Sequence, residues 1–533
     1  MARRNGTTSK PGKPDNLEDT LWKAADKLRG SMDSAEYKHF VLGLIFLKYV
    51  SDAFAQRREE IGRELADDGI TGDRAAQFLE DVDEYVGRGV FWVPPLARWD
   101  AIAISAKSGS DGKTIGELLD GAMGEIERAN EELRGVLPKV FNRPGVDERR
   151  LAELVDLIGK LGFGDQAGHA RDLLGHVYEY CLGRFAAAEG RRGGEFYTPQ
   201  SVVRLLVEVL EPAPGSRVYD PCCGSGGMFV QAEKFIETHG GRPFDISVYG
   251  QELNQNTWRL AKMNLAIHGI GAKLGPRWAD TFHDDLHPDL RADVAMANPP
   301  FNMSDWGGDQ LPLDPRWVYG VPPAANANFA WIEHIVSKLS RRGSAGIVMA
   351  NGSMSSKQSG EGDIRRAMVQ DDLIACIVAL PPQLFRTTQI PACLWFLTRD
   401  KTPQGARALK DRRSEVLFID AGNMGTSVDR TTRILTDKDI AKIAGTYHTW
   451  RGIDRDTPYE DEQGFCYSAE LMEVKQHDHV LTPSRYIGTP DAEEDGEPLT
   501  EKIQRLTKEL YDYFEKSSRL EGEIHIQLGK IDV

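Results

Sequence analysis

The sequence predicts an α/β protein in which a doubly wound, Rossmann-like sheet follows an α-helical N-terminal domain and precedes a C-terminal helical tail. Short β-rich runs alternate with helical stretches after residue 190, as in parallel, doubly wound sheets. Few strand signals occur before that point. We therefore expect four parts: a disordered tail, a helical domain, a sheet domain, and a linker with a final helix, at 1–15, 16–165, 166–485 and 486–533.

Amphipathic periodicity supports the helical domain. Asn16 is a plausible N-cap, and apolar residues follow it at helical spacing up to Leu28. Further helical stretches begin at Ser34 and cover 114–134, 147–162 and 173–190.

Two late β-rich runs, 393–400 and 415–423, have no helix between them. We expect them to add antiparallel strands at one edge of the sheet.

Bulk composition limits the function. With 533 residues and 41% hydrophobic residues, the chain is too long for a single core. Its longest apolar run, 40–47, is far shorter than the ~20 residues of a membrane span, so no membrane association is expected. The six cysteines form neither a disulfide scaffold nor a Cys-x-x-Cys zinc site, which favours a cytoplasmic protein without a metal.

The net charge of −16 is unusual for a protein that binds DNA by itself, because phosphate neutralisation supplies most of the affinity. Either a basic cleft lies within an acidic protein, or a partner holds the nucleic acid.

A glycine loop follows the first β-rich run, in "VYDPCCGSGGMF" (218–229). Gly224, Gly226 and Gly227 would let the backbone approach a ligand closely, and Asp220 before them could accept from an ammonium group or stabilise the loop. The spacing is not Gly-x-Gly-x-x-Gly and no Walker lysine is present, so phosphate binding is not expected. Cys222 and Cys223 are interpreted as packing residues.

Glu252 ends the next β-rich run, where a carboxylate can accept from both hydroxyls of a ribose. Taken alone it could be a solvated carboxylate. Together with the glycine loop it indicates a nucleoside cofactor without a pyrophosphate, and S-adenosylmethionine fits.

A rigid corner, "ANPPFN" (297–302), follows a third buried run. Pro299 and Pro300 restrict the backbone, so the side-chain oxygen of Asn298 and the carbonyl of Pro299 can form two neighbouring acceptors for an NH₂ group. Phe301 offers an aromatic plane for a flat base. Such a corner suits methyl transfer to an exocyclic amine, and the target base would have to leave the duplex to reach it.

These motifs resemble the modification subunit of type I restriction–modification systems, an N6-adenine DNA methyltransferase family, over nearly the whole chain. The segments that carry the resemblance are "GGEFYTPQSVVRLLVEVL" (193–210), "DPCCGSGGMF" (220–229), "GQELN" (250–254), "ANPPFN" (297–302) and "LPPQLFRTTQIPACLWFL" (380–397).

The resemblance implies that S-adenosylmethionine is contacted by one set of residues: Glu195, Phe196, Tyr197, Thr198, Pro199, Gln200, Ser225, Gly226, Gly227 and Glu252. It implies that Asn298, Pro299 and Phe301 hold the adenine, and that Asp280 lies near the cofactor adenine or the transfer site. Ser225 stands where the family more often has threonine.

The resemblance also implies partners. A separate specificity subunit would read double-stranded DNA, two copies of this chain would join one such subunit, and a restriction and translocation subunit would complete the system.

The final helix carries an apolar stripe that could pack on its own chain or on another subunit; it consists of Ile503, Leu506, Leu510, Tyr513, Phe514, Leu520 and Ile524.

Other functions remain open at this level. A protein glutamine methyltransferase uses a similar corner but is shorter, and an N4-cytosine DNA methyltransferase more often begins it with serine. A non-catalytic assembly subunit would not need Asn298 and Glu252 intact.

Overall fold

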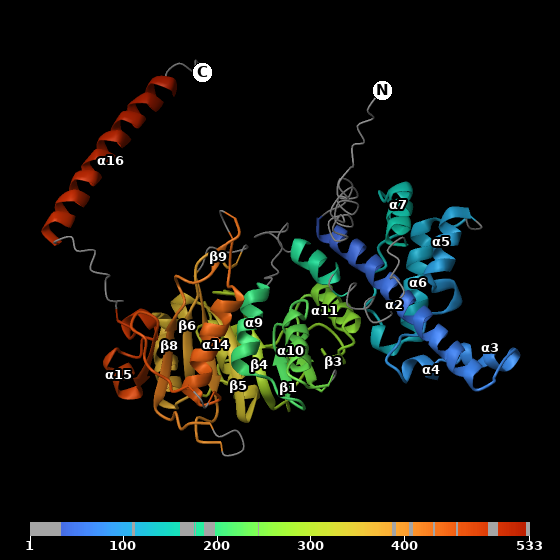
Figure 1. Ribbon diagram of the computed structural model, residues 1–533, viewed down its shortest axis with the longest axis horizontal. Helices are drawn as coiled ribbons and strands as arrows, with labels where there is room; N and C mark the ends of the chain where they lie inside the picture. Colours follow the sequence, from blue (N-terminus) through green and yellow to red (C-terminus); the bar gives the residue numbers. More distant parts are fainter. Residues whose placement is uncertain are drawn as a thin grey trace, which may run out of the picture.

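The computed structural model describes 34–108, 112–159, 175, 177–185, 198–242, 245–385, 391–404, 409–429, 432–454, 457–488 and 499–528. The predicted tail, the predicted helix at 17–28 and the boundary near residue 165 lie outside these ranges. Figure 1 shows a helical region, a central sheet covered by helices, and one long helix away from both.

The N-terminal region is helical, as predicted. Its helices are α2 (Ser34–Asp67), α3 (Asp73–Leu79), α4 (Asp83–Val86), α5 (Trp99–Ser108), α6 (Ile115–Ala129) and α7 (Glu148–Gly159). Thr114 caps α6: its side chain accepts from the Glu117 amide, and the Glu117 carboxylate accepts from the backbone amide of Thr114. The long helix α2 also packs against α11 (Gln255–Ile267) of the sheet region.

Nine strands form the main sheet, in the order β11-β8-β6-β7-β5-β4-β1-β2-β3. In chain order they are β1 (Arg217–Asp220), β2 (Ser247–Gly250), β3 (Ala272–Lys273), β4 (Ala292–Ala297), β5 (Leu339–Ala350), β6 (Ile374–Ala379), β7 (Ala392–Thr398), β8 (Glu415–Asp420) and β11 (Cys466–Glu470). Two short strands, β9 (Thr426–Ser427) and β10 (Arg433–Ile434), form a separate hairpin.

The expectation for the two late strands was wrong. Strand β7 is antiparallel but lies inside the sheet, between β5 and β6, and β8 runs parallel to β6. The antiparallel edge strand is β11. Every residue of β7 is buried, since neighbours on both edges and helices on both faces cover it, and such a strand has no polar alternation that marks its position.

Helices cover both faces of the sheet, which makes it doubly wound. One face packs on α9 (Gln200–Leu210), α10 (Gly227–Thr238), α11 and α14 (Asp437–Arg451). The other packs on α12 (Asn328–Lys338), α13 (Glu361–Gln370) and α15 (Leu471–Gln476). Successive strand residues alternate between the two cores, as Val218 and Tyr219 do.

The strand order reverses at β1. The chain goes from β1 to β2 and β3 on one side and returns to β4 and β5 on the other, and β1 is parallel to both β2 and β4. Ligands of open α/β sheets bind at the carboxyl ends of the strands at such a point. The glycine loop after β1 and the Asn-Pro-Pro-Phe corner after β4 therefore lie on neighbouring strands.

The C-terminal helix α16 (Leu499–Leu528) stands away from the rest of the molecule (Figure 1). Its described apolar side chains are exposed: Ile503, Leu510, Tyr511, Tyr513, Phe514 and Leu520. The side chains of Leu506 and Ile524 lie outside the described set. Among the described residues, no helix combines the length and the apolar character that a membrane crossing requires.

Candidate active site

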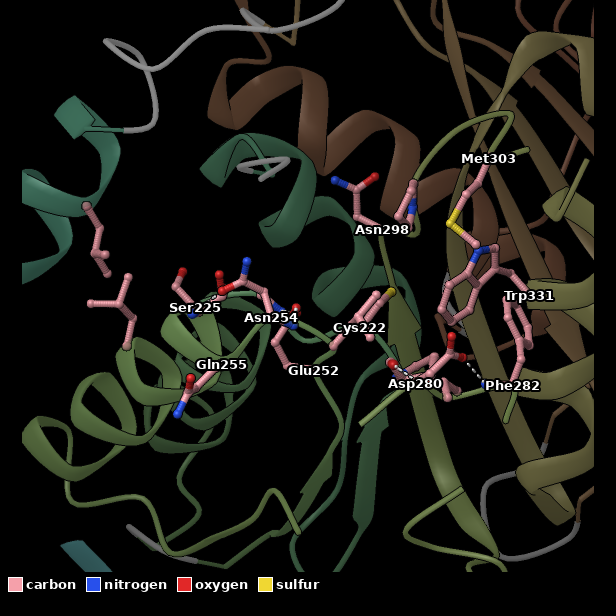
Figure 2. Close-up of a pocket in the computed structure, with 18 of the residues that line it drawn as sticks. Cys222, Ser225, Glu252, Asn254, Gln255, Asp280, Phe282, Asn298, Met303 and Trp331 are labelled. Atoms are coloured by element: carbon pink, nitrogen blue, oxygen red, sulfur yellow. Dashed lines mark hydrogen bonds between the residues drawn. The ribbon is translucent and has the colours of Figure 1, made fainter. Parts of the chain in front are cut away.

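A cavity of about 540 Å³ lies at the carboxyl ends of β1, β2 and β4 (Figure 2). Six of the residues predicted for the site line it: Gly224, Ser225, Glu252, Asp280, Asn298 and Pro300. The switch point thus brings together the proposed cofactor loop, the ribose carboxylate and the proposed catalytic corner.

The glycine loop between β1 and α10 needs glycine for two different reasons. Gly224 has φ 54°, and a Cβ there would meet no atom within 4 Å, so the backbone is open to the cavity. Gly226 has φ 79°, and a Cβ there would meet Leu265 of α11 at 3.2 Å. Gly226 and Gly227 thus shape the turn into α10, while Gly224 and Ser225 face the ligand space.

Glu252 holds the glycine loop as well as lining the cavity. One carboxylate oxygen accepts from the backbone amide of Gly224 at 3.0 Å, and the other accepts from the amide of Asn254 at 2.8 Å. A carboxylate oxygen can accept more than one hydrogen bond. Glu252 is therefore oriented by the backbone, with its carboxylate at the wall of the cavity.

Asp220 is buried under the loop, not in the cavity wall. Its Oδ1 accepts from the amide of Cys222 at 3.0 Å. Burial, with a smaller contribution from the charge of Glu252, raises the pKa of Asp220 to about 7. A carboxyl group with this pKa ionises readily when a cation arrives nearby.

Asp280 begins a tight turn beside the cavity. Its Oδ1 accepts from the amide of Phe282 at 2.8 Å (Figure 2). Arg316 holds the same turn by donating to the carbonyl oxygens of Thr281 and Phe282, and it also pairs with Asp314.

Arg316 also determines the protonation of a buried histidine. Arg316 can only donate, so Nδ1 of His334, 3.0 Å away, accepts, and Nε2 donates to the Tyr219 hydroxyl at 2.9 Å. Burial and the charge of Arg316 hold the pKa of His334 well below its usual range. Through neutral His334, this hydrogen-bond network connects the loop around Arg316 to β1.

Asn298 has one polar atom paired and one unpaired. Its Nδ2 donates to the hydroxyl of Thr198 at 2.9 Å. Its Oδ1 is buried and has no hydrogen-bond partner among the described residues. A buried acceptor without a donor costs on the order of 1–3 kcal/mol, so the site is arranged to receive a donor there.

Two aromatic rings meet after the corner. Phe301 is half-buried and contacts Phe385 edge-on, with ring centroids 6.1 Å apart. Phe385 lies in the late segment 380–397 and places that segment beside the corner. Pro299 and Phe301 do not line the cavity directly, although their neighbours Asn298 and Pro300 do.

The predicted methionine-side motif is described only in part. Glu195, Phe196 and Tyr197 lie outside the described residues. Thr198 contacts Asn298, and Pro199 accepts from the Val202 and Val203 amides at the start of α9, where Gln200 is exposed. None of these three residues lines the cavity, and a cofactor contact for them stays a prediction.

Several lining residues were not predicted. Lys38 comes from α2 and Leu182 from the helical segment 177–185, so the helical region supplies part of the wall. Phe282, Met303 and Trp331 form an apolar side near Asp280 (Figure 2). The indole NH of Trp331 is buried and has no described partner. The aromatic content of 278–331 was a sequence signal for Phe282 and Trp331, and none pointed to Lys38 or Leu182.

The packing role predicted for the two loop cysteines fits Cys223, which is buried, whereas Cys222 is half-buried and lines the cavity. Burial raises the pKa of Cys222 and Cys223 well above the usual value, so both remain neutral thiols. Within the described part of the chain, no group of three or more His, Cys, Asp or Glu side chains could hold a metal ion.

Comparisons with known proteins agree with this geometry. Residues 169–495 match the family model for N-6 DNA methylases, and residues 17–160 match the model for the HsdM N-terminal domain. The methylase subunit of the type I restriction enzyme HindI from Haemophilus influenzae is 48% identical over 82% of this chain and 99% of that protein.

Two further relatives extend the comparison. The MjaIX methylase subunit from Methanocaldococcus jannaschii is 37% identical over 95% of this chain and 90% of its own length. The crystal structure of a type I restriction–modification methyltransferase subunit from Streptococcus thermophilus superimposes with a TM-score of 0.72 at 27% identity, covering 88% of this chain and 99% of that one. The chain belongs to the N-6 DNA methylase family, as a methylase subunit of the type I restriction enzymes.

Proposed function

We propose that this subunit transfers a methyl group from S-adenosylmethionine to the N6 amino group of an adenine in DNA. The observation that carries the proposal is the amide of Asn298. Its nitrogen donates to Thr198, and its buried Oδ1 meets no donor among the residues that the structure describes.

The cavity residues fit S-adenosylmethionine. Gly224 offers a backbone surface without a side chain, and Glu252 offers an oriented carboxylate for the ribose hydroxyls. Asp220 lies under the loop, outside the cavity wall, and its carboxyl group, with a pKa of about 7, can respond to an ammonium group across the loop. When bound, this cofactor supplies an electrophilic methyl group.

The corner would act on the target base. In our proposal Asn298 and the carbonyl of Pro299 accept the two N–H groups of the adenine amine, and Phe301 and Phe385 contact the flat base. Two acceptors favour a pyramidal nitrogen and stabilise the positive charge that develops on it. The rate enhancement then comes from positioning and electrostatics, and no side-chain nucleophile is required.

Adenine is the favoured target for two reasons. The corner begins with asparagine at residue 298, and the family model that matches is that of N-6 methylases, not N4-cytosine enzymes. Asn298 and Glu252 are both present and oriented, which argues for an active subunit over a purely structural one.

Sequence choice would come from a partner. We propose a complex of two copies of this chain with one specificity subunit, which a restriction subunit can join. A chain with net charge −16 neutralises few phosphates, so a partner would supply most of the DNA affinity. The exposed apolar stripe of α16 supports a helix contact with that partner, and the complex would work in the cytoplasm, on host DNA.

The test is to co-express the chain with its genomic neighbours in a host without DNA methylation and to map modified bases. We expect N6-methyladenine within one short sequence motif. The Asn298→Ala variant should assemble equally well and lose at least a hundredfold in rate. Methylation of cytosine, or full activity of the alanine variant, would contradict the proposal.

A further inference from the structure

The Asn-Pro-Pro-Phe corner is followed by a residue in a left-handed conformation. Asn302 has φ 51°, in the region that asparagine adopts more readily than most residues with a side chain. The prolines restrict the backbone at Pro299 and Pro300, but they do not determine how the chain leaves Phe301. Something else must hold the exit of the corner.

Asn328, the first residue of α12, makes a reciprocal pair with Asn302. Its Oδ1 accepts from the backbone amide of Asn302 at 3.0 Å, and its Nδ2 donates to the side-chain oxygen of Asn302 at 2.8 Å. Asn328 is 3% exposed, so water does not compete with these bonds. A second link lies beside the pair, where the Ala327 amide donates to the carbonyl of Met303 at 3.0 Å.

The helix that carries Asn328 is rigidly placed. It packs against β5, and its Phe329 contacts the ring of Trp395 in β7 with centroids 6.1 Å apart. The corner is therefore attached at both ends: its entry leaves β4, and its exit is bound to a helix packed on the same sheet.

We infer that Asn328 is a positioning residue for methyl transfer, which holds Phe301 and the Asn298 amide in register by bonding Asn302. The inference rests on the proposed function, because Asn328 would support the same corner from behind without touching the substrate. Asn328 does not line the cavity, so its effect should appear in the rate of transfer and not in cofactor binding.

Substitutions at the pair give a specific test in the assembled complex with its specificity subunit. Asn328→Ala should lower kcat ten- to hundredfold, since small displacements of reacting groups are costly. The dissociation constant of S-adenosylmethionine should stay within about twofold, as expected for a residue outside the cavity. Fluorescence of a 2-aminopurine at the target position should also change, because the stacking surface of Phe301 moves.

Aspartate variants separate the pair from simple loss of structure. In Asn328→Asp, the Asn302 amide can turn over and donate, and in Asn302→Asp, Asn328 still donates. Each single variant should therefore keep kcat within about threefold of wild type, because one donor remains. The double variant leaves two carboxylates facing each other with no side-chain donor between them, only the backbone amide of residue 302, and should lose activity as Asn328→Ala does.

Asn326→Ala is the matched control. Its Oδ1 accepts from the amide of Asn328 at 3.0 Å, so the variant weakens the start of the same helix but leaves the pair intact. We expect a lower melting temperature with unchanged kcat. The inference is overturned if Asn328→Ala has wild-type kcat, if Asn326→Ala loses as much activity, or if the double aspartate variant equals the single ones. Absence of adenine methylation by the wild-type complex would instead refute the proposed function.

Discussion

The hydroxyl oxygen of Thr198 accepts a 2.9 Å hydrogen bond from Nδ2 of Asn298, a residue 100 positions away in the chain. With the amide in this orientation, Oδ1 is the atom left to accept. Without it the amide could turn over and present a donor to the target amine, which needs an acceptor.

Thr198→Val should therefore slow methyl transfer by about tenfold, since it removes a bond that holds a catalytic group in the right orientation. Steady-state and single-turnover rates of the complex on its target DNA measure the effect. Thr198→Ser keeps the hydroxyl and should stay near wild type. Equal loss in both variants would show that the methyl group, not the hydrogen bond, matters.

Glu252→Ala should weaken binding of S-adenosylmethionine ten- to hundredfold, because hydrogen bonds to a charged group contribute roughly 1.5–3 kcal/mol. Loss of the bond to the Gly224 amide should also loosen the glycine loop. Isothermal titration calorimetry on the isolated chain measures the affinity. Glu237→Ala, an exposed carboxylate on α10, is the control and should bind normally; unchanged affinity of Glu252→Ala would refute the ribose assignment.

Asp220 should make cofactor binding dependent on pH. Its pKa is about 7 in the folded protein, so below pH 7 the carboxyl group is mostly protonated and no longer attracts an ammonium group bound above the loop. Affinity should fall as the pH drops from 8 to 6, by up to about tenfold per unit below the pKa. Calorimetry in buffers of different ionisation enthalpy should detect proton release near pH 6.5.

The same carboxyl group should make the folded protein more stable as the pH falls below 7. Its pKa is raised on folding, so the ligand-free protein carries the full cost of burying the charge above pH 7. The free energy of unfolding should gain a contribution as the pH falls from about 7 toward 4. Asp220→Asn should abolish this contribution and the pH dependence of binding; persistence of both in the variant would assign them to another group.

The stripe on α16 should be needed for assembly. Replacing Leu510 and Phe514 with serine, or deleting 490–533, should leave cofactor binding intact and prevent complex formation with the specificity subunit. Asp512→Ser with Glu515→Ser alters the opposite face of the helix and is the control. Size-exclusion chromatography of co-expressed subunits checks the result, and normal assembly of the stripe variant would show that the partner binds elsewhere.

The sequence was sufficient to predict features carried by local chemistry. Glycine widens and proline narrows the allowed backbone conformations, so turns could be anticipated at Gly224 and Gly226 after β1 and at Pro299 and Pro300 after β4. Glu252 could be placed at the end of β2 because it directly follows a β-rich run. The doubly wound fold could also be predicted, because the alternation of helices and strands is written in local patterns of apolar residues.

Contacts between distant segments could not be predicted in this way. Strand β7 enters the middle of the sheet because its two neighbours and both helix layers bury it, and no local pattern encodes that position. Asn328 and Arg316 bond to the site across 26 and 34–35 residues, and asparagine and arginine in a loop have many ordinary roles. Only the folded arrangement shows what they hold.

Lys38 gives the cavity a wall that belongs to another folding unit, since it lies on α2 while the glycine loop lies on the sheet. Both the helical region and the sheet region therefore form the cavity wall, and a fragment that contains only the sheet region would have a cavity open on that side. The shape of the cavity then depends on the angle between the helical region and the sheet region. A protein bound to the helical region would therefore act on the cavity through Lys38 and Leu182, at a distance from Asn298.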